Sequence, residues 1–263
     1  MSTAEAVTHE PQYTRDLILQ LADSKRLLGM RYAEWILGAP ELEAGIACAS
    51  MAQDEWGHAR LLYAMLRDFG DDVDALEHGR EAGAYANIPV LDSPPADWPD
   101  LVVINALLDT ALSVQLEALR NSEYAPLRQR VQKMLDEERF HVAHGTAWFR
   151  RLATATSASR DALADAVEKV APELIRWFGP DSERARTMQN ASIVDGAPSE
   201  LRVRFLGRVA PLLSHIDAGD ALANLEPTFD GFDESTRRTG RGGPDAETVE
   251  KIRGDKNRAF LMD

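Results

Sequence analysis

Cysteine is nearly absent from this sequence: Cys48 is the one cysteine among 263 residues, so no disulfide can form within the chain. This usage is typical of a reducing compartment, and we expect a cytoplasmic protein in which Cys48 is a small core residue. No run of 18 consecutive apolar residues occurs, and Met1 to Pro11 lacks the apolar segment of an export signal. We therefore expect no membrane span.

Positive charge is also scarce. The chain has 29 Lys and Arg residues against 43 Asp and Glu residues, which gives a formal net charge of −14. Such a surface repels phosphate backbones and anionic lipid headgroups. Nucleic acid and membranes are therefore excluded as the main partners.

What the sequence does contain is helical periodicity, with apolar residues three and four positions apart, and no convincing strand pattern. The predicted helices cover residues 13–37, 41–69, 98–121, 126–153, 158–178 and 198–216. Glycines and prolines between 71 and 98 predict a long crossover with one short helix. This order predicts an all-α, ferritin-like four-helix bundle with one long crossover and additional C-terminal helices. Residues 1–12 would be a flexible N-terminus, 13–225 the ferritin-like domain, and 226–263 an irregular tail with a short last helix.

Two Glu-x-x-His motifs lie in the second and fourth predicted helices: Glu55 with His58, and Glu138 with His141. Residues three apart share a helix face, so each pair can direct a carboxylate and an imidazole to one point. Each motif falls in or beside the apolar stripe of its helix. Because buried carboxylates need a partner or a metal, the two motifs predict one shared site.

Helix geometry indicates the remaining ligands. Glu138 lies about 20 Å past its turn at 1.5 Å per residue, which places Asp109 level with it on the antiparallel helix. The same construction for Glu55 leads to Asp23, Ser24 or Lys25. The apolar stripe favours Ser24 or Lys25 as the inward side chain, although Asp23 is the one carboxylate of the three.

Two interpretations of this cluster remain open. The set of Glu55, His58, Asp109, Glu138 and His141 can hold two irons, one, or none. If Lys25 points inward, its ammonium neutralises carboxylates without metal, and the cluster becomes a buried salt-bridge network. His144, one turn beyond His141, is expected to support the ligands or to belong to the core, and not to be a ligand itself.

Several segments together resemble the A and C subunits of phenylacetyl-CoA epoxidase, from about Tyr13 to Ala218. They are Gly38-Ala39-Pro40, Gln53-Asp54-Glu55-Trp56-Gly57-His58, Leu108-Asp109, Glu137-Glu138-Arg139-Phe140-His141, Phe178-Gly179-Pro180 and Glu200-Leu201-Arg202-Val203-Arg204-Phe205. In that family, the A subunit has a di-iron site, and the C subunit has a decayed site and a structural role. The segment Asp23-Ser24-Lys25 departs from the catalytic pattern, which has a glutamate at that level.

The resemblance implies a subunit of a multicomponent di-iron oxygenase that inserts one oxygen atom from O2 into the aromatic ring of an aryl-acyl-CoA. Glu55 and Glu138 would be the catalytic carboxylates and also iron ligands. Electrons would come from a separate flavin and iron–sulfur reductase, because the single cysteine of this chain cannot hold an iron–sulfur cluster. Small accessory subunits together with a homologous ferritin-like subunit would complete a homo- or hetero-oligomer. The alternative is a non-catalytic structural subunit with a metal-free site.

Overall fold

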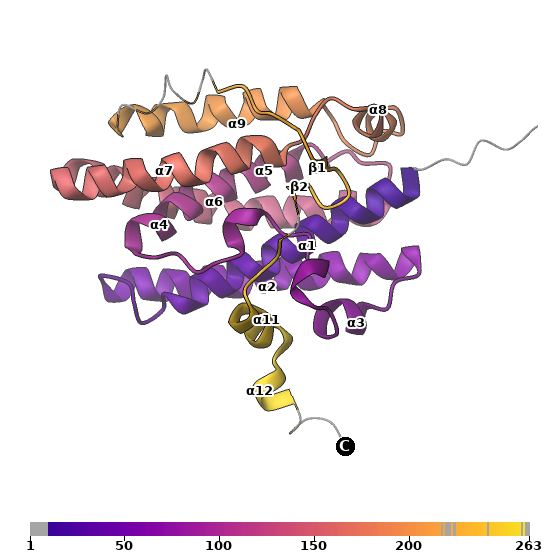
Figure 1. Ribbon diagram of the computed structural model, residues 1–263, viewed down its shortest axis with the longest axis horizontal. Helices are drawn as coiled ribbons and strands as arrows, with labels where there is room; N and C mark the ends of the chain where they lie inside the picture. The colour runs from indigo at the N-terminus through magenta and orange to yellow at the C-terminus, as the bar shows by residue number, and fades with distance from the viewer. Residues whose placement is uncertain are drawn as a thin grey trace, which may run out of the picture.

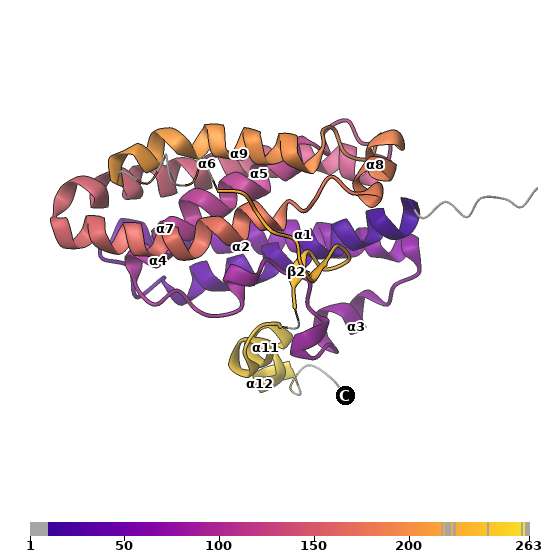
Figure 2. The ribbon, with the colours of Figure 1, turned by 45° about the horizontal axis from the view of Figure 1, so that its top comes forward.

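The computed structural model describes residues 10–216, 218, 222, 225–240, 242–258 and 260. The described part is mostly helical with very little strand, and its long helices run side by side in stacked layers (Figures 1 and 2). α1 and α2 form one layer, α5 and α6 form the next, and α7 and α9 cover the far side. This arrangement confirms the all-α, ferritin-like architecture expected from the sequence.

The first helical hairpin consists of α1 (Glu10–Glu34) and α2 (Leu42–Met65). The two helices pack closely at the turn, because Gly45 lies directly against the backbone of Ile36. A Cβ on residue 45 would come within 2.4 Å of the Ile36 carbonyl oxygen. The 3-10 turn η1 (Leu66–Phe69) ends the hairpin at Gly70, whose positive φ of 85° is readily adopted only by glycine.

The crossover between the hairpins is ordered by short helices and by one buried ion pair. It contains α3 (Val73–His78) and the 3-10 turns η2 (Ala82–Ala84) and η3 (Pro89–Leu91). The fully buried carboxylate of Asp23 on α1 accepts hydrogen bonds from Arg80, from the Tyr63 hydroxyl and from the backbone N–H of Ala86. Asp23 therefore fastens the crossover to the first hairpin.

The second hairpin pairs a segmented helix with α6 (Ala125–Ala155). The segmented helix runs through α4 (Trp98–Val103), the π-helix η4 (Ile104–Leu108) and α5 (Asp109–Glu117). By length and composition Trp98–Glu117 could cross a membrane, but 89% of its apolar window is buried inside the protein. It is therefore the core helix of the bundle.

Gly145 explains how α6 approaches the π-helix so closely. A Cβ at residue 145 would meet the backbone N of Ala106 at 2.7 Å and atoms of Asn105 at 2.8 Å. The π-turn widens the helix at this point, just before Asp109. π-turns of this kind are frequent at functional sites.

The remaining elements cover the bundle. They are α7 (Ser157–Trp177), α8 (Glu183–Asn190), α9 (Pro198–Leu213), the 3-10 turn η5 (Ser214–Ile216), β1 (Phe232–Asp233), β2 (Arg238–Thr239), α11 (Ala246–Arg253) and α12 (Asp255–Arg258). β1 and β2 pair antiparallel in front of α1, and the chain then descends past the first hairpin into α11 (Figure 1). Arg31 of α1 anchors α11 by donating a hydrogen bond to the Thr248 hydroxyl.

Local details differ from the sequence-based expectation. α1 begins at Glu10, so residues 10–12 belong to a helix, while residues 1–9 lie outside the described part. The π-helix, α8 and the two short strands were not foreseen. A periodicity count cannot detect one extra residue in a helical turn, and α8 has a single buried residue, Met188, which leaves almost no apolar stripe. The proposed division into three parts stays a prediction.

Candidate metal centre or buried ion-pair network

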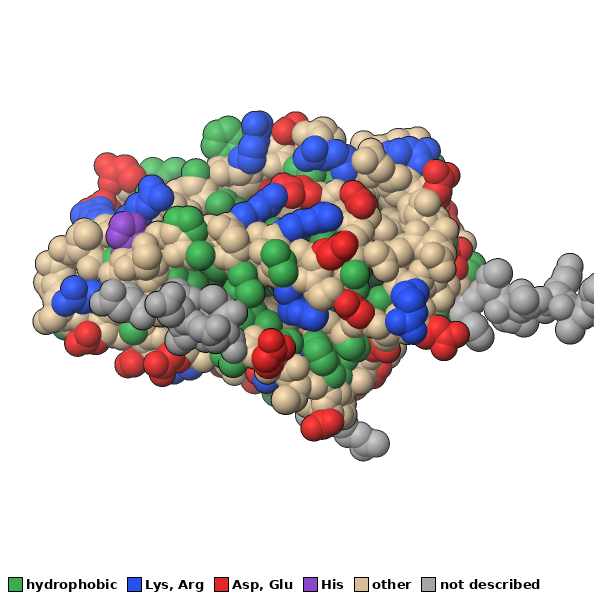
Figure 3. All heavy atoms as spheres, turned by 90° about the horizontal axis from the view of Figure 1, so that it is seen from above, with side chains coloured by type: hydrophobic (Ala, Val, Ile, Leu, Met, Phe, Trp, Pro, Cys, Tyr) green, Lys and Arg blue, Asp and Glu red, His purple; other side chains and the backbone are tan. Residues whose placement is uncertain are grey.

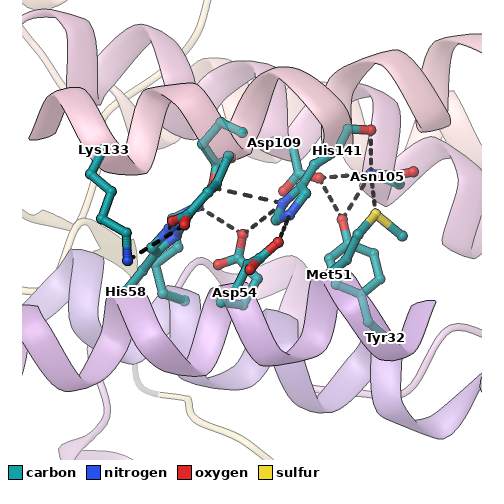
Figure 4. Close-up of polar contacts among 12 residues, drawn as sticks. Tyr32, Met51, Asp54, His58, Asn105, Asp109, Lys133 and His141 are labelled. Carbon is teal, nitrogen blue, oxygen red and sulfur yellow. Dashed lines mark hydrogen bonds and ion pairs between the residues drawn. The ribbon is translucent and has the colours of Figure 1, made fainter. Parts of the chain in front are cut away.

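The side chains of the two Glu-x-x-His motifs meet between the two hairpins, as the sequence predicted. Glu55 and His58 come from α2, Glu138 and His141 from α6, and Asp109 from the first residue of α5. All five are buried, with exposed fractions of 2% or less. Figure 4 shows His58, Asp109 and His141 lying between the two layers of helices. Four residues (Glu55, Asp109, Glu138 and His141) each offer a ligand atom within 4.8 Å of the others.

Lys25 is the inward residue on α1, and its side chain is fully buried. Its Nζ atom donates to Oε1 of Glu138 at 2.5 Å and to Oε1 of Glu55 at 3.0 Å. One ammonium group thus bridges the glutamates of both motifs. Of the three candidates on α1, Lys25 is the one that faces the cluster.

Asp23 and Ser24 are buried but face elsewhere. Asp23 binds Arg80 and the crossover, and Ser24 donates to the carbonyl of Gln20 and accepts from the N–H of Ile88. Their places follow from the helix rotation of about 100° per residue, which sends neighbouring side chains to different faces. No carboxylate from the described length of α1 therefore joins the cluster.

Two acidic residues that sequence analysis did not single out hold the histidines. His58 Nε2 lies 2.7 Å from Glu137 Oε2, and His141 Nε2 lies 3.3 Å from Asp54 Oδ2. Each acid directly precedes the glutamate of one motif and contacts the histidine of the other. The repeated pattern acid-Glu-x-x-His, Asp54-Glu55 and Glu137-Glu138, was the signal that could have identified them. Such contacts fix the orientation of an imidazole ring.

Asp109 lies among neutral donors. Its Oδ2 accepts a hydrogen bond from the Tyr32 hydroxyl at 2.5 Å and from Asn105 Nδ2 at 2.7 Å. Asn105 also donates to the carbonyl of His141, and its Oδ1 contacts His144 Nδ1 at 2.9 Å. The expectation that His144 supports the site from behind agrees with this contact. Asn105 belongs to the π-helix, so the bulge delivers a side chain that connects α5 to α6.

The charges of the cluster compensate one another. Burial alone would lower the pKa of Lys25, but the carboxylates of Glu138 and Glu55 raise it above its ordinary value. Burial opposes ionisation of Glu138, yet the charge of Lys25 holds its pKa well below the usual range. Burial also disfavours protonated His141, while its contact with Glu55 and the charge of Asp109 raise its pKa to about 10. Burial, with the charge of Glu138, raises the pKa of Asp109 to about 7.

A pair of metal ions does not fit this arrangement. Lys25 Nζ lies between the Oε1 atoms of Glu55 and Glu138, so the glutamates of both motifs already share one cationic partner. A metal pair would also have to displace a fully buried ammonium, which costs several kcal/mol when the charge is left unpaired. The cluster retains some capacity for one cation, because Glu55 Oε2, Glu138 Oε2 and Asp109 Oδ1 have no hydrogen-bond partner among the described residues.

Two helical hairpins with a carboxylate–histidine cluster between them define a ferritin-like protein of the class in which two helices each contribute a Glu-x-x-His motif. The chain belongs to the phenylacetic acid catabolic protein family, which matches residues 1–219.

Two relatives come from Escherichia coli (strain K12). The chain is 27% identical to the A subunit of 1,2-phenylacetyl-CoA epoxidase over 220 residues, which cover 79% of this chain and 71% of the relative. It is 29% identical to the C subunit of the same enzyme over 196 residues, which cover 73% and 77%. The chain thus resembles both subunits to a similar degree. The resemblance inferred from the motifs is confirmed, and the relatives support a role in phenylacetate catabolism within a multisubunit assembly.

Proposed function

We propose that this chain is a non-catalytic subunit of a multicomponent oxygenase of the phenylacetyl-CoA epoxidase type, in which its bundle supports a homologous metal-containing subunit. The observation that carries the proposal is the buried ammonium of Lys25 between Glu55 and Glu138. It favours the non-catalytic structural subunit over the oxygenase subunit, which the sequence motifs had favoured.

Charge balance supports a metal-free cluster. Lys25 and protonated His141 supply two positive charges, which match the negative charges of Glu55 and Glu138. His58, whose pKa is also raised, is balanced separately by its contact with Glu137. Asp109, with its raised pKa and its neutral donors Tyr32 and Asn105, adds at most a partial charge near neutral pH. A buried group of ions that is already neutral gains little from a further cation.

Ligand count supports the same conclusion. Ferritin-like di-metal sites take a glutamate from each of two helices in addition to the two Glu-x-x-His motifs. Here α5 supplies Asp109, but α1 supplies Lys25 in place of a carboxylate. The cluster has three carboxylates and one ammonium where the metal-binding pattern has four carboxylates.

A second candidate, the oxygenase subunit itself, rests on the unpartnered carboxylate oxygens of Glu55, Asp109 and Glu138. In that case these residues would hold iron together with His58 and His141, and a separate reductase would supply electrons. Iron would supply the activation of O2 for attack on an aryl-acyl-CoA.

Metal analysis by mass spectrometry of protein expressed with added iron separates the two candidates. The proposal expects no stoichiometric iron in the wild-type chain, and bound iron in the Lys25→Glu variant, which restores the fourth carboxylate. Lys133→Glu, an exposed change on α6, is the matched control and should bind none. Two irons per wild-type chain, lost in Glu138→Ala, would overturn the proposal.

An activity assay tests the proposal in a second way. Epoxidation of phenylacetyl-CoA is expected from a homologous metal-containing subunit together with this chain, and not from this chain with a reductase alone. Turnover by this chain and a reductase without a homologue would establish the oxygenase instead.

A further inference from the structure

The outer face of α2 is unusual for a helix at the edge of the protein. Nine of its residues are exposed, and two of the nine are charged. They are Leu42, Glu43, Ile46, Ser50, Gln53, Trp56, Gly57, Arg60 and Ala64. On α7 the comparable exposed set has seven residues, of which five are charged. These are Ser157, Ala158, Arg160, Asp161, Asp165, Glu168 and Lys169.

The opposite side of the molecule has an ordinary polar surface. Seen from above, the side on which α9 lies shows acidic and basic side chains scattered among the apolar ones (Figure 3). α2 lies on the other side of the stack (Figure 1). The inner face of α2 already packs on the core, and its exposed face has two charged residues beside the large apolar side chains of Leu42, Ile46 and Trp56. Depletion of charged residues, with large apolar side chains exposed, is typical of a surface that contacts another protein.

Seven of the exposed residues follow one line along α2 with steps of four and three, as in helices that pack against another helix. They are Leu42, Ile46, Ser50, Gln53, Gly57, Arg60 and Ala64. Leu42 is 77% exposed and Ile46 is 60% exposed, so the first half of the line presents large aliphatic side chains. The second half is open, because no described atom lies within 4 Å of a Cβ placed on Gly57.

Trp56 borders this second half, with its indole ring lying back against Gly29 of α1. A groove of about 600 Å³ results, bounded by residues of α2 that include Gln53, Gly57 and Arg60, and on its far side by Lys251 and Ile252 of α11. The face thus has knobs at one end and a hollow at the other.

We propose that α2 packs against α2 of a second copy of this chain, antiparallel and about a twofold axis near Gln53. Such an axis places residues opposite each other when their numbers sum to about 106, because a twofold contact is self-complementary. Leu42 then faces the small Ala64 of the second copy, Ile46 faces the aliphatic stem of Arg60, and Ser50 faces the hollow at Gly57. The large aliphatic side chains of each copy therefore do not collide with each other.

The charges favour the same arrangement. Glu43 and Arg60, the two charged residues of the face, have no ion-pair partner among the described residues and lie at opposite ends of it. An antiparallel pair brings each glutamate within about one helical turn of the arginine on the other chain. A parallel pair would instead set like charges side by side. The dimer therefore contains two equivalent Glu43–Arg60 pairs, one at each end of the contact.

The experiment is sedimentation equilibrium of the full chain, whose mass is 29.1 kDa. A dimer is expected for the wild type. Ile46→Arg should raise the dissociation constant by roughly ten- to a hundredfold, because it buries an unpaired charge within the contact. Gly57→Leu should also weaken the dimer by filling the hollow. Val203→Arg, at a 69% exposed apolar position on α9, is the matched control and should leave it unchanged.

A charge exchange tests the geometry itself. Arg60→Glu alone should weaken the dimer, and adding Glu43→Arg in the same chain should restore it, which only an antiparallel pairing of identical faces explains. The proposal is overturned by a monomeric wild type, by a dimer that survives Ile46→Arg, or by failure of the exchange to restore it. Association only with a homologous subunit would likewise overturn it. None of these outcomes depends on whether the cluster binds metal.

Discussion

The Nζ atom of Lys25 lies 2.5 Å from Oε1 of Glu138, and both side chains are at most 1% exposed. α1 and α6 are 113 residues apart at these two positions, yet this contact joins the two hairpins at their centre. A buried contact between full charges is strong only while both partners remain. The stability of the bundle therefore depends on a position at which ferritin-like di-metal bundles supply a carboxylate.

Lys25→Met is expected to destabilise the protein by about 3–5 kcal/mol, because it leaves Glu55 and Glu138 buried without a cation. Urea denaturation measures the loss. Lys133→Met removes a 70% exposed lysine that pairs with Glu137 and should cost less than about 1 kcal/mol. Equal effects of the two variants would contradict the importance of the buried contact.

Stability should fall as the pH rises from about neutral towards 10. The pKa of His141 is raised from 6.5 to about 10 in the folded protein, so its contribution is complete below 6.5 and is lost as the pH approaches 10. The raised pKa of Asp109 acts in the same direction, and its contribution to stability is lost as the pH rises from 3.8 through about 7. The lowered pKa of Glu138 acts oppositely, and its contribution is lost as the pH falls below 4.5.

Unfolding free energies across this pH range test these signs. The alkaline decline should become shallower in His141→Gln, because that variant has no proton to lose. A wild-type stability that is flat between pH 6.5 and 10 would show that His141 is not protonated in the folded state.

Asp23→Asn is expected to loosen the crossover. The change removes the charge that pairs with Arg80, a residue whose side chain is only 9% exposed, and should cost about 3–5 kcal/mol. Limited proteolysis should then cut faster between residues 79 and 84. Asp74→Asn, which affects a 78% exposed carboxylate paired with Arg258, is the control and should change neither quantity. Unchanged cleavage in Asp23→Asn would mean that other contacts hold the crossover.

Gly145→Ala and Gly207→Ala should have opposite effects although both lie inside helices. The new methyl group at 145 would collide with the backbone of Ala106, and the expected loss is about 1–3 kcal/mol. Residue 207 has open space around it, and replacing glycine there should stabilise the helix by about 0.5–1 kcal/mol. Thermal denaturation of both variants checks the pair. A stable Gly145→Ala would show that the π-helix can move away from α6.

The sequence by itself determined the long helices, the crossover and the five residues Glu55, His58, Asp109, Glu138 and His141. The helical period gives the face on which each side chain lies, and the fixed rise per residue gives its height along the helix axis. Neither quantity depends on how the partner helices pack. The family also followed, because its motifs are local segments of the chain.

Only the tertiary structure decided which of Asp23, Ser24 and Lys25 enters the cluster, and that the histidines are held by Asp54 and Glu137. Adjacent residues on a helix differ by about 100° in direction, so the choice depends on how α1 is rotated against three other helices. That rotation is set by packing over the whole core and by the Asp23–Arg80 pair from the crossover. The charge that occupies the centre of the bundle is therefore a property of the assembled fold, because no local pattern specifies the rotation of a helix about its own axis.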